Sequence, residues 1–600
     1  MRGNLAYRPG LDGVRALAVL GVLLYHGGVA PFPGGFLGVD VFFVLSGFLI
    51  TSLLLREFDL TGTIRLVPFW LGRIRRLLPA ALLVIVASLL AVALFSTNDL
   101  GALRGDSIAS ALYVNNWHQV FADRSYFEAF GRPSLLQHYW SLAVEEQFYL
   151  LWPPLLLAGL LWLGRRWTAF VVVVAAALSL ALMALLYDPA SDPSRVYYGT
   201  DTRAMPILIG VALAFVWPAM LPGTRSDIRG RTAIDALGLV GLAGVIAAMV
   251  SIEDSSGFTY RGGLLLVALA SALLIAAVAH PASRLGRLMG AAPCVWIGAR
   301  SYGIYLWHWP IMAMTRPGQD ISESKALIVA LQIAATLVVA ELSYRYIELP
   351  VRRRHFEAWV RERVAGSRTR RGAALAGAAA LVAGFIVLIA ALPTTTRDLS
   401  RLPVATAAAS GRPSAVAGGA QPVSVPISAR IGEFKLPLAA GRWSYVAPKG
   451  PVLMVGASVM LGTQPALKER INAKVDAAVS RSPQAIIDRL AAYRAADALP
   501  PVVGFQVGEN GPLTKDMYRQ LRAALKGVPR VIIVTIRAPS QSWVDETNDQ
   551  LHRLTRTWPE ATIADWYEAS SDPSLLWDGT HPNPEGQKRY AEVVAQAIGR

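Results

Sequence analysis

Four polar residues in the last quarter of the chain have the types and spacing of a serine-type acyl-transfer site. Ser458 follows a short apolar run over Val452–Val455, Asn510 comes later, and Asp578 precedes His581 by three positions. Acyl transfer of this type needs a hydroxyl, a base that takes its proton and a group that orients the base. Ser458, His581 and Asp578 fit these roles in that order. The side-chain amide of Asn510 and the backbone amide of Ser458 would hold the oxyanion.

The alternative is a plain α/β domain with a serine in a turn and a histidine capping a helix. This alternative explains each residue alone, but it does not explain why the serine, the asparagine and the Asp-x-x-His pair occur in this order.

The region from Pro451 onward alternates short apolar runs with amphipathic segments, which predicts a parallel sheet with helices on both faces. The apolar runs cover Val452–Val455, Val502–Val507 and Val531–Ile536, and the amphipathic segments cover Gln484–Ala498, Lys515–Leu525, Val544–Thr557 and Pro584–Ile598. Reactive groups of such sheets lie at the carboxyl ends of the strands, which is where Ser458 falls.

The composition of the whole chain is that of a membrane protein. Hydrophobic residues make up 54% and charged residues 16% of the 600 residues, and the mean hydropathy is +0.42. We predict eleven spans, near 11–30, 37–55, 79–95, 147–163, 168–187, 204–221, 233–251, 263–280, 294–314, 325–344 and 373–392. The N-terminus has no small-residue cleavage site, so we take its apolar run as the first span.

Charge and cysteine usage exclude other classes. The net charge of +16 gathers in loops between spans rather than on a soluble basic domain, which argues against a nucleic-acid partner. The single cysteine, Cys294, excludes an intrachain disulfide and a cysteine metal cluster, and no metal site is expected.

Loop charges predict the orientation independently of hydropathy. With the N-terminus in the cytoplasm, the inner loops are basic: Arg65, Arg73, Arg75, Arg76, Arg165, Arg166, Arg225, Arg229, Arg231, Arg284, Arg287, then Arg352 to Arg371. The outer loops are poorer in basic residues and richer in acidic ones: Asp99, Asp106, Asp123, Glu128, Asp188, Asp192, Glu253, Asp254 and Asp320. Every alternation agrees with the positive-inside rule, which places the C-terminal domain outside.

Ionisable residues inside spans are costly and are therefore candidates for function. Arg15 and His26 project from nearly the same face of the first span, about 16 Å apart. His308 lies in a span rich in Trp and Tyr, and the enrichment of these residues at membrane interfaces explains them but not His308. Snorkelling of Arg15 and internal hydrogen bonding of His26 are the structural alternatives. Asp40 is expected at the outer interface.

Two charged clusters flank spans. Arg73, Arg75 and Arg76 are expected on the cytoplasmic side just before the third span, where guanidinium groups suit the phosphates of a nucleotide-bearing acyl donor. Glu145 and Glu146 open the fourth span from the outer side, where the helix dipole alone would favour carboxylates.

The C-terminal motifs resemble the SGNH-hydrolase superfamily over about Pro451 to Arg600. The resemblance implies an α/β/α (flavodoxin-like) domain with Ser458 as nucleophile, Asn510 as oxyanion donor, and Asp578 with His581 completing the triad. Two positions depart from the pattern: Ala457 replaces the usual Asp, and Ser480 stands where a glycine is expected. The Cβ of Ser480 restricts the backbone there, so a weakened site is one expectation.

Five strings between Tyr7 and Arg354 resemble the acyltransferase-3 family of polytopic membrane proteins. They are Leu11–Arg15 to His26, Gly38 to Gly47, Arg73 to Arg76, Trp140 to Phe148, and Ser301 to His308. The resemblance implies that His26 is the essential membrane histidine and that Arg15, Arg73 and Arg75 serve donor binding or catalysis. It also implies a cytoplasmic acyl-CoA donor, usually acetyl-CoA, with no permanently bound cofactor.

The combination of an acyltransferase-3-like membrane region with an SGNH-like C-terminal region looks like the bacterial envelope O-acetyltransferases. We expect a membrane domain at 1–354 (about ten spans), a basic loop and extra span at 355–392, a linker at 393–450 and an extracytoplasmic domain at 451–600. The expected function is transfer of an acyl group to an envelope glycan or glycolipid hydroxyl by a protein of the cytoplasmic membrane. Three alternatives stay open: an esterase, a transporter of an acylated lipid or sugar with a non-catalytic tail, and a membrane domain that acylates alone.

Overall fold

The computed structural model describes residues 7–95, 100–122, 133–188, 193–217, 230–254, 256–317, 320–321, 324–353, 450–478, 481–538, 543–576 and 579–600. The predicted span at 373–392 and most of the predicted linker lie outside these residues. So do Ser480 and Asp578.

Ten long helices in the described part overlap the first ten predicted spans. They are α1 (Pro9–His26), α2 (Gly38–Thr61), α3 (Leu66–Phe95), α6 (Tyr139–Trp162), α7 (Gly164–Leu186), α9 (Thr200–Val216), α10 (Arg231–Ser251), α11 (Leu264–Ala279), α13 (Ala292–Met314) and α14 (Lys325–Ser343). The shorter elements are η1 (Gly35–Leu37), α4 (Leu100–Ala111), α5 (Asn115–Phe121), α8 (Ser194–Tyr198), η3 (Thr259–Gly263), α12 (Arg284–Met289), η4 (Tyr344–Glu348) and α15 (Leu349–Arg352).

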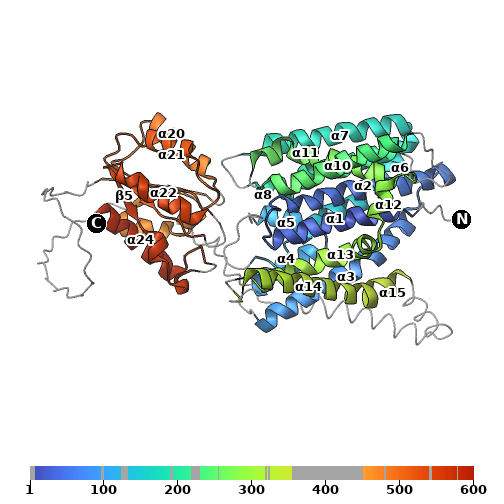
Figure 1. Ribbon diagram of the computed structural model, residues 1–600, viewed down its shortest axis with the longest axis horizontal. Helices are drawn as coiled ribbons and strands as arrows, with labels where there is room; N and C mark the ends of the chain where they lie inside the picture. The colour runs from blue at the N-terminus through green and yellow to red at the C-terminus, as the bar shows by residue number, and fades with distance from the viewer. Residues whose placement is uncertain are drawn as a thin grey trace, which may run out of the picture.

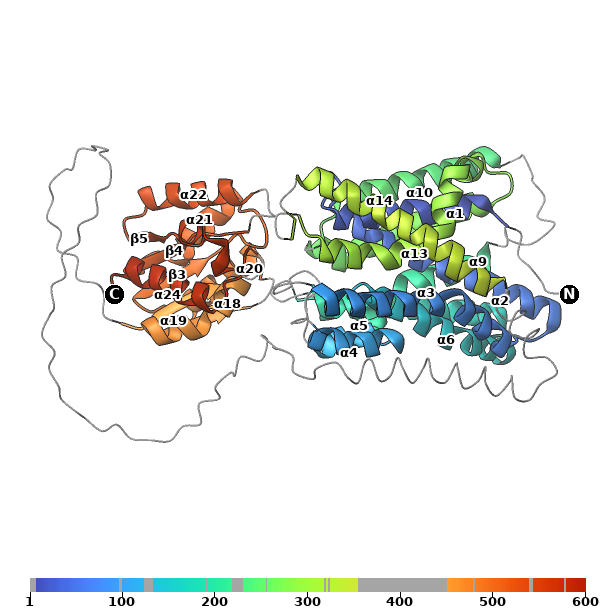
Figure 2. The same ribbon diagram turned by 90° about the horizontal axis from the view of Figure 1, so that it is seen from below.

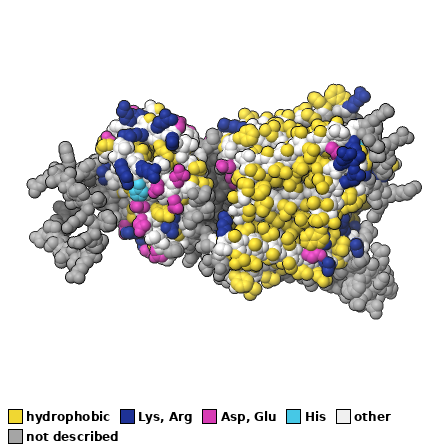
Figure 3. Space-filling view, in the orientation of Figure 1, with side chains coloured by type: hydrophobic (Ala, Val, Ile, Leu, Met, Phe, Trp, Pro, Cys, Tyr) yellow, Lys and Arg dark blue, Asp and Glu magenta, His cyan; other side chains and the backbone are white. Residues whose placement is uncertain are grey.

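The long helices lie side by side as one bundle (Figures 1 and 2). Six helical segments, containing α2, α3, α7, α10, α11 and α14, are long and apolar enough to cross a membrane. The most apolar part of α7 has a mean hydropathy of 2.8, yet only 22% of it is buried. Figure 3 shows hydrophobic side chains covering the visible side of the bundle, with Lys and Arg at the end near the N-terminus. Such a surface is suited to lipid, because in water it would be a large exposed apolar patch.

Two charged clusters lie deeper in helices than the hydropathy pattern predicted. Helix α3 begins at Leu66, so Arg73, Arg75 and Arg76 lie within the helix, not in a loop before it. Helix α6 begins at Tyr139, which places Glu145 almost two turns inside. The helix dipole acts within the first turn, so the dipole explanation for this carboxylate is wrong.

Helices α1 and α13 approach each other closely where their backbones meet. A Cβ atom placed on Gly298 of α13 would lie 1.9 Å from the carbonyl oxygen of Asp12 in α1. Only glycine permits this contact, because any side chain would push the two helices apart.

The C-terminal domain contains a five-stranded parallel sheet in the order β2-β1-β3-β4-β5. The strands are β1 (Val452–Gly456), β2 (Ala473–Ala477), β3 (Val502–Gln506), β4 (Arg530–Val534) and β5 (Ala561–Ala564). The helices are α18 (Ser458–Gly462), α19 (Gln464–Ile471), α20 (Pro483–Ala495), α21 (Lys515–Ala524), α22 (Val544–Arg556), α23 (Trp566–Ala569), η6 (Pro573–Leu575) and α24 (Pro584–Ile598). This is the flavodoxin-like strand order, in which the side of the sheet to which successive strands are added switches at the boundary between β1 and β3.

Alternate side chains of the strands enter two separate cores. Val452 and Met454 pack with residues of α19 and α24 on one face. Leu453 and Val455 pack with residues of α20, α21 and α22 on the other face. The alternation of strand side chains therefore builds the three-layer α/β/α domain that the sequence predicted.

Candidate active site

The structure joins the predicted nucleophile to the predicted base. Nε2 of His581 lies 3.0 Å from Oγ of Ser458, within hydrogen-bond reach. Both residues are nearly buried, with 2% of Ser458 and 7% of His581 exposed. A base at this distance can take the hydroxyl proton directly, which is the geometry that nucleophilic acyl transfer requires.

The fold places this pair at the carboxyl end of the sheet. Ser458 is the first residue of α18, two positions after β1 ends, so its backbone amide is one of the donors that a helix start leaves unsatisfied. His581 precedes α24, whose N-cap is Asn583. The side-chain oxygen of Asn583 accepts from the backbone amides of Glu585 and Gly586, which anchors the loop that carries His581.

Asn510 follows β3, the strand next to β1, so it lies at the same edge of the sheet as Ser458. Its Nδ2 donates to the carbonyl oxygen of Arg481 at 3.3 Å. An amide NH2 group has two hydrogens, so this contact orients the group and leaves a second hydrogen for an oxyanion. The carbonyl oxygen of Arg481 therefore holds the side-chain amide of Asn510, the predicted oxyanion donor, in position.

Arg481 is a residue that the sequence reasoning missed. Its guanidinium donates to the carbonyl oxygen of Asp476 at 2.7 Å and to Oδ1 of Asp476 at 2.9 Å, and it lies 3.4 Å from the carbonyl oxygen of Gly456. It thus ties the ends of β1 and β2 to the loop that holds Asn510. The only local signal for this is Asp476, which precedes Arg481 by five residues close to Ser480, the position where the resemblance expects a glycine.

Hydrogen bonds hold Asp476 in its charged form. Burial by itself would raise its pKa, but bonds from Arg489, Tyr493 and Arg481 outweigh burial and lower the pKa of this carboxyl below its ordinary value.

Ala457, which replaces the expected Asp, is 1% exposed and belongs to the apolar cluster of Leu453, Val455 and Ile486. A carboxylate here would enter an apolar core, so the methyl group fits its surroundings.

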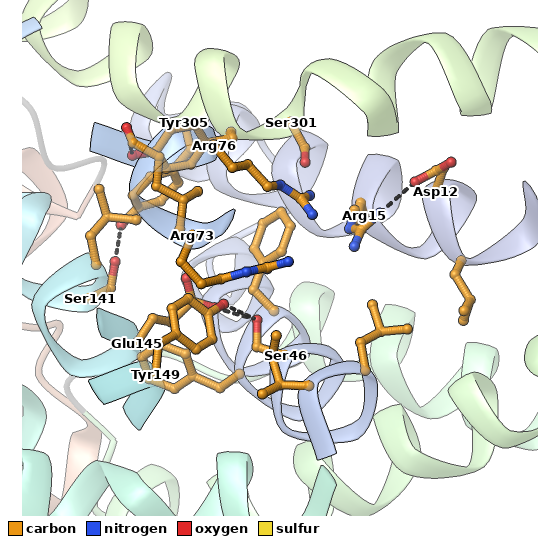
Figure 4. Close-up of a pocket in the computed structure, with 18 of the residues that line it drawn as sticks. Asp12, Arg15, Ser46, Arg73, Arg76, Ser141, Glu145, Tyr149, Ser301 and Tyr305 are labelled. Atoms are coloured by element: carbon orange, nitrogen blue, oxygen red, sulfur yellow. Dashed lines mark hydrogen bonds and ion pairs between the residues drawn. The ribbon is translucent and has the colours of Figure 1, made fainter. Parts of the chain in front are cut away.

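A cavity of about 350 Å³ lies inside the helix bundle. Figure 4 shows the side chains of Arg15, Arg73 and Arg76 converging on it from α1 and α3. Ser46 donates to Oε1 of Glu145 at 2.6 Å in the same cavity, and the hydroxyl of Tyr149 lies 3.1 Å from Oγ of Ser46. The structure thus brings two clusters that the sequence placed on opposite sides of the membrane to one site.

The cavity does not include every predicted residue. Arg75 and Glu146 are absent from its lining, although both flank residues that contribute to it. A second cavity of about 310 Å³ shares Arg15 and Arg76 with the first and adds Glu348 and Arg352. The two cavities therefore form one basic region with carboxylates at its edges.

Two histidines lie outside the lining of this cavity: His308 is buried and His26 is half-buried. Nδ1 of His26 is 3.1 Å from Nε2 of His308. A third histidine, His138, which sequence reasoning missed, has its ring centroid 5.7 Å from that of His308. It immediately precedes α6 and falls outside the apolar stretch that marked this span. Within the described ranges, no group of His, Cys, Asp and Glu could hold a metal ion.

Tyr305 connects the cavity to the histidines. It lines the cavity, its hydroxyl is 2.6 Å from Oγ of Ser141, and it donates to the carbonyl oxygen of His138 at 3.1 Å.

The expectation that Asp40 is interfacial is wrong. Its carboxylate pairs with Arg203 of α9 at 3.1 Å, and both side chains are fully buried. Arg203 also lies over the rings of Phe43, Trp140 and Tyr197. This pair joins α2 to α9 inside the bundle.

A multi-helix membrane bundle with a basic cavity and a second domain with a serine–histidine pair defines a membrane-bound acyltransferase. The family model described as an acyltransferase domain (Acyl_transf_3) matches residues 8–345. The chain therefore belongs to the acyltransferase-3 family.

One relative matches along nearly the full length of both chains. The chain is 34% identical over 626 residues to the peptidoglycan O-acetyltransferase OatA of Listeria monocytogenes, with 100% of this chain and 99% of that protein covered. Among solved structures it is similar to the C-terminal catalytic domain of the Streptococcus pneumoniae peptidoglycan O-acetyltransferase A with a methylsulfonyl adduct, at 25% identity and a TM-score of 0.24, covering 25% of this chain and 92% of that one. The protein is an O-acetyltransferase and a multi-pass membrane protein.

Proposed function

We propose that this protein transfers acetyl groups from cytoplasmic acetyl-CoA to hydroxyl groups of peptidoglycan outside the membrane. The observation that carries the proposal is the 3.0 Å contact between Ser458 and His581 in a domain attached to the membrane acyltransferase. The acceptor is proposed because the Listeria relative, which is named for peptidoglycan O-acetylation, matches along the full length of both chains.

The bundle cavity supports an acyl-CoA donor. Arg15, Arg73 and Arg76 line it, and guanidinium groups bind phosphates through charge-assisted hydrogen bonds. The cavity is otherwise largely apolar, with Val39, Leu49 and Ile50 in its wall, which suits an acyl arm. His26 would act as a base beyond it.

The distribution of basic residues supports a cytoplasmic entrance. Arg15, Arg73, Arg76 and Arg352 surround the paired cavities, and Lys and Arg gather at the same end of the bundle as the N-terminus (Figure 3). Because basic residues favour the cytoplasmic side, the proposed orientation has the N-terminus inside and the C-terminal domain outside.

The serine step is proposed as two acyl transfers. Oγ of Ser458 attacks the acyl carbonyl while Nε2 of His581 takes its proton, and the backbone amide of Ser458 with Asn510 holds the oxyanion. The leaving group departs with the proton from His581, which leaves an ester on Ser458. A glycan hydroxyl then attacks this ester, gives its proton to His581, and Ser458 recovers a proton as it leaves. Asp578 would orient His581.

The test measures alkali-labile acetyl groups on peptidoglycan, lipid and polysaccharide fractions of cells that lack the protein. The strain is complemented with wild type, His26→Ala or Ser458→Ala at matched membrane levels. The proposal expects both variants to lose acetyl groups from peptidoglycan. Loss with His26→Ala alone would mean that the membrane domain acylates directly, and no loss with either would favour the transporter alternative. Free acetate without transfer would indicate an esterase.

A further inference from the structure

A tryptophan of the C-terminal domain connects the Asn510 loop (residues 508–511) to the helix that follows β4. Nε1 of Trp543 donates to the carbonyl oxygen of Gly508 at 2.9 Å, two residues before Asn510. An indole N–H can only donate and a carbonyl oxygen can only accept, so this hydrogen bond has one direction. Trp543 is half-buried and Gly508 is buried. Water therefore competes poorly for this bond, and losing the donor is costly for the buried carbonyl group.

Trp543 is itself held by a helix that is anchored to the sheet. It stands at the N-cap position of α22. Five residues later, the side chain of Asn548 bonds the backbone of Ile536 twice: Oδ1 accepts from its N–H at 2.9 Å, and Nδ2 donates to its carbonyl oxygen at 2.8 Å. Ile536 follows the last residue of β4 by two positions. The start of α22, and with it the indole ring, is therefore tied to the end of a central strand.

The backbone at Gly508 lies directly against α22. Its φ of +110° is a conformation that glycine adopts readily and other residues rarely adopt. A Cβ atom at this position would lie 2.9 Å from Cγ2 of Thr547 in α22 and 2.8 Å from Cδ1 of Leu513. Because glycine is the most flexible residue, a contact that holds its carbonyl group restricts the direction in which the chain continues to Asn510.

Asn510 is thus held at its side chain and through the backbone before it. The carbonyl oxygen of Arg481 accepts from Nδ2 of Asn510 at 3.3 Å, and Trp543 holds the carbonyl group of Gly508. We infer that Trp543 is a positioning residue for Asn510: its indole N–H keeps the Asn510 loop where the second amide hydrogen reaches the oxyanion. The inference rests on the proposed function, in which Asn510 stabilises the oxyanion that forms at Ser458.

Two substitutions separate this role from simple packing. Packing depends on the size and apolar character of the ring, whereas positioning depends on its N–H. Trp543→Phe keeps an apolar six-membered ring and removes the donor. Trp543→His loses the six-membered ring but keeps a five-membered ring. In the tautomer with hydrogen on Nε2, its N–H lies as many bonds from Cβ as the N–H of the indole.

The test uses the purified full-length protein with p-nitrophenyl acetate, which acetylates Ser458 and releases p-nitrophenol. We expect Trp543→Phe to lower kcat on the order of tenfold with KM little changed. The reason is that the oxyanion exists in the transition state and not in the bound substrate, and a misplacement of its donor by about 1 Å is costly. Trp543→His is expected to recover at least part of the loss.

Trp558→Phe is the matched control. Trp558 belongs to the same domain and is also largely buried, with 4% exposed. It precedes β5, so it lies at the amino ends of the parallel strands, at the edge of the sheet opposite to Ser458. Its substitution is expected to leave kcat within about twofold of wild type, because the site is distant from the Asn510 loop.

A double-mutant comparison tests whether Trp543 acts through Asn510. In an Asn510→Ala background, Trp543→Phe is expected to have little further effect on kcat, so the two losses do not add. Additive losses overturn the inference, and so does a folded Trp543→His variant with no higher kcat than Trp543→Phe. If Trp543→Phe does not fold, Trp543→Met takes its place in the same comparison.

The proposed function can fail separately from the inference. Acetylation of Ser458 by the ester requires neither acetyl-CoA nor the membrane domain. If the ester acetylates Ser458 with the expected dependence on Trp543, but cells lacking the protein keep all acetyl groups of peptidoglycan, only the proposed function is refuted. An Asn510→Ala variant with the kcat of wild type would refute the oxyanion role of Asn510 and the inference with it.

Discussion

Ser46 of α2 donates a 2.6 Å hydrogen bond to Glu145 of α6 within the basic cavity of the bundle. The bond connects residues 99 positions apart in sequence. It places a carboxylate beside Arg15 and Arg73, which lie on two other helices.

Ser46→Ala is expected to lower the free energy of unfolding by about 1–3 kcal/mol, because Glu145 loses its donor in a partly buried site. Ser52 on the same helix is a matched control, since its buried hydroxyl has no hydrogen-bond partner among the described residues. Ser52→Ala should change stability by less than about 0.5 kcal/mol. Unfolding in mixed detergent micelles measures the stability of both variants. Equal losses of stability would contradict a stabilising role for the hydrogen bond between Ser46 and Glu145.

Arg73→Gln and Arg76→Gln are each expected to raise the KM for the acyl donor about tenfold or more, because a lost charge-assisted hydrogen bond costs about 1.5–3 kcal/mol. Arg75 lies between them in sequence but does not line the cavity. Arg75→Gln should therefore stay within about twofold of wild type. Steady-state kinetics with purified protein gives the donor KM of each variant. If Arg75→Gln has the largest effect on this KM, the acyl donor binds outside the cavity.

A sulfonyl fluoride is expected to label Ser458, because His581 lies where it can take the proton of the Ser458 hydroxyl. His581→Ala should slow labelling by about 10²-fold or more. Ser482 provides an internal control, since its side chain caps α20 by accepting from Ala485 and has no such role. Mass spectrometry of the digested protein measures the extent of labelling at Ser458 and at Ser482. Unchanged labelling of Ser458 in the variant would refute base activation.

Arg481→Met is expected to reduce acetyl transfer by roughly tenfold or more, because the carbonyl oxygen of Arg481 orients Asn510, the proposed oxyanion donor, and misplacement of such a group is costly. Arg489 is the matched control: it pairs with the same Asp476, but its side chain is 53% exposed against 11% for Arg481. Arg489→Met should cost less than about 1 kcal/mol in stability and leave turnover within about twofold. If the two variants behave alike, Arg481 acts only through the charge of Asp476.

Asp476→Asn is expected to destabilise the C-terminal domain at neutral pH. The folded-state pKa of Asp476 lies below its ordinary value of 3.8, so its stabilising effect is fully present above that value. It is lost as the pH falls through the lower folded-state pKa. Calorimetry of the full chain should therefore show a difference between wild type and variant that is constant from neutral pH to about pH 4 and shrinks below it. A difference that grows in acid would contradict this.

The sequence revealed the central strands because they are buried on both faces and are therefore almost continuously apolar. It did not reveal β2 and β5, which lie at the two edges of the sheet and read Ala-Lys-Val-Asp-Ala and Ala-Thr-Ile-Ala. Edge strands contact fewer neighbours, so polar residues and short length are tolerated there.

The membrane site was less accessible to sequence reasoning because its contacts are non-local. Hydropathy located the apolar part of α3 but not its basic first turns, so Arg73 was assigned to a loop. Asp40 and Arg203 are 163 residues apart, and nothing near either residue indicated the other. The pairing of Ser458 with His581 was predictable, since the carboxyl ends of parallel strands meet at one edge.

The contact of Gly298 with Asp12 sets the axial register of α13 on α1. His308 lies ten residues beyond Gly298 and His26 fourteen beyond Asp12, so the two rings meet about 15–20 Å further along the same pair of helices. A methyl group at Gly298 would push the two helices apart and so disturb the packing on which the contact between the histidines depends. The contact between the two histidines thus depends on a glycine that lies about three turns away from them.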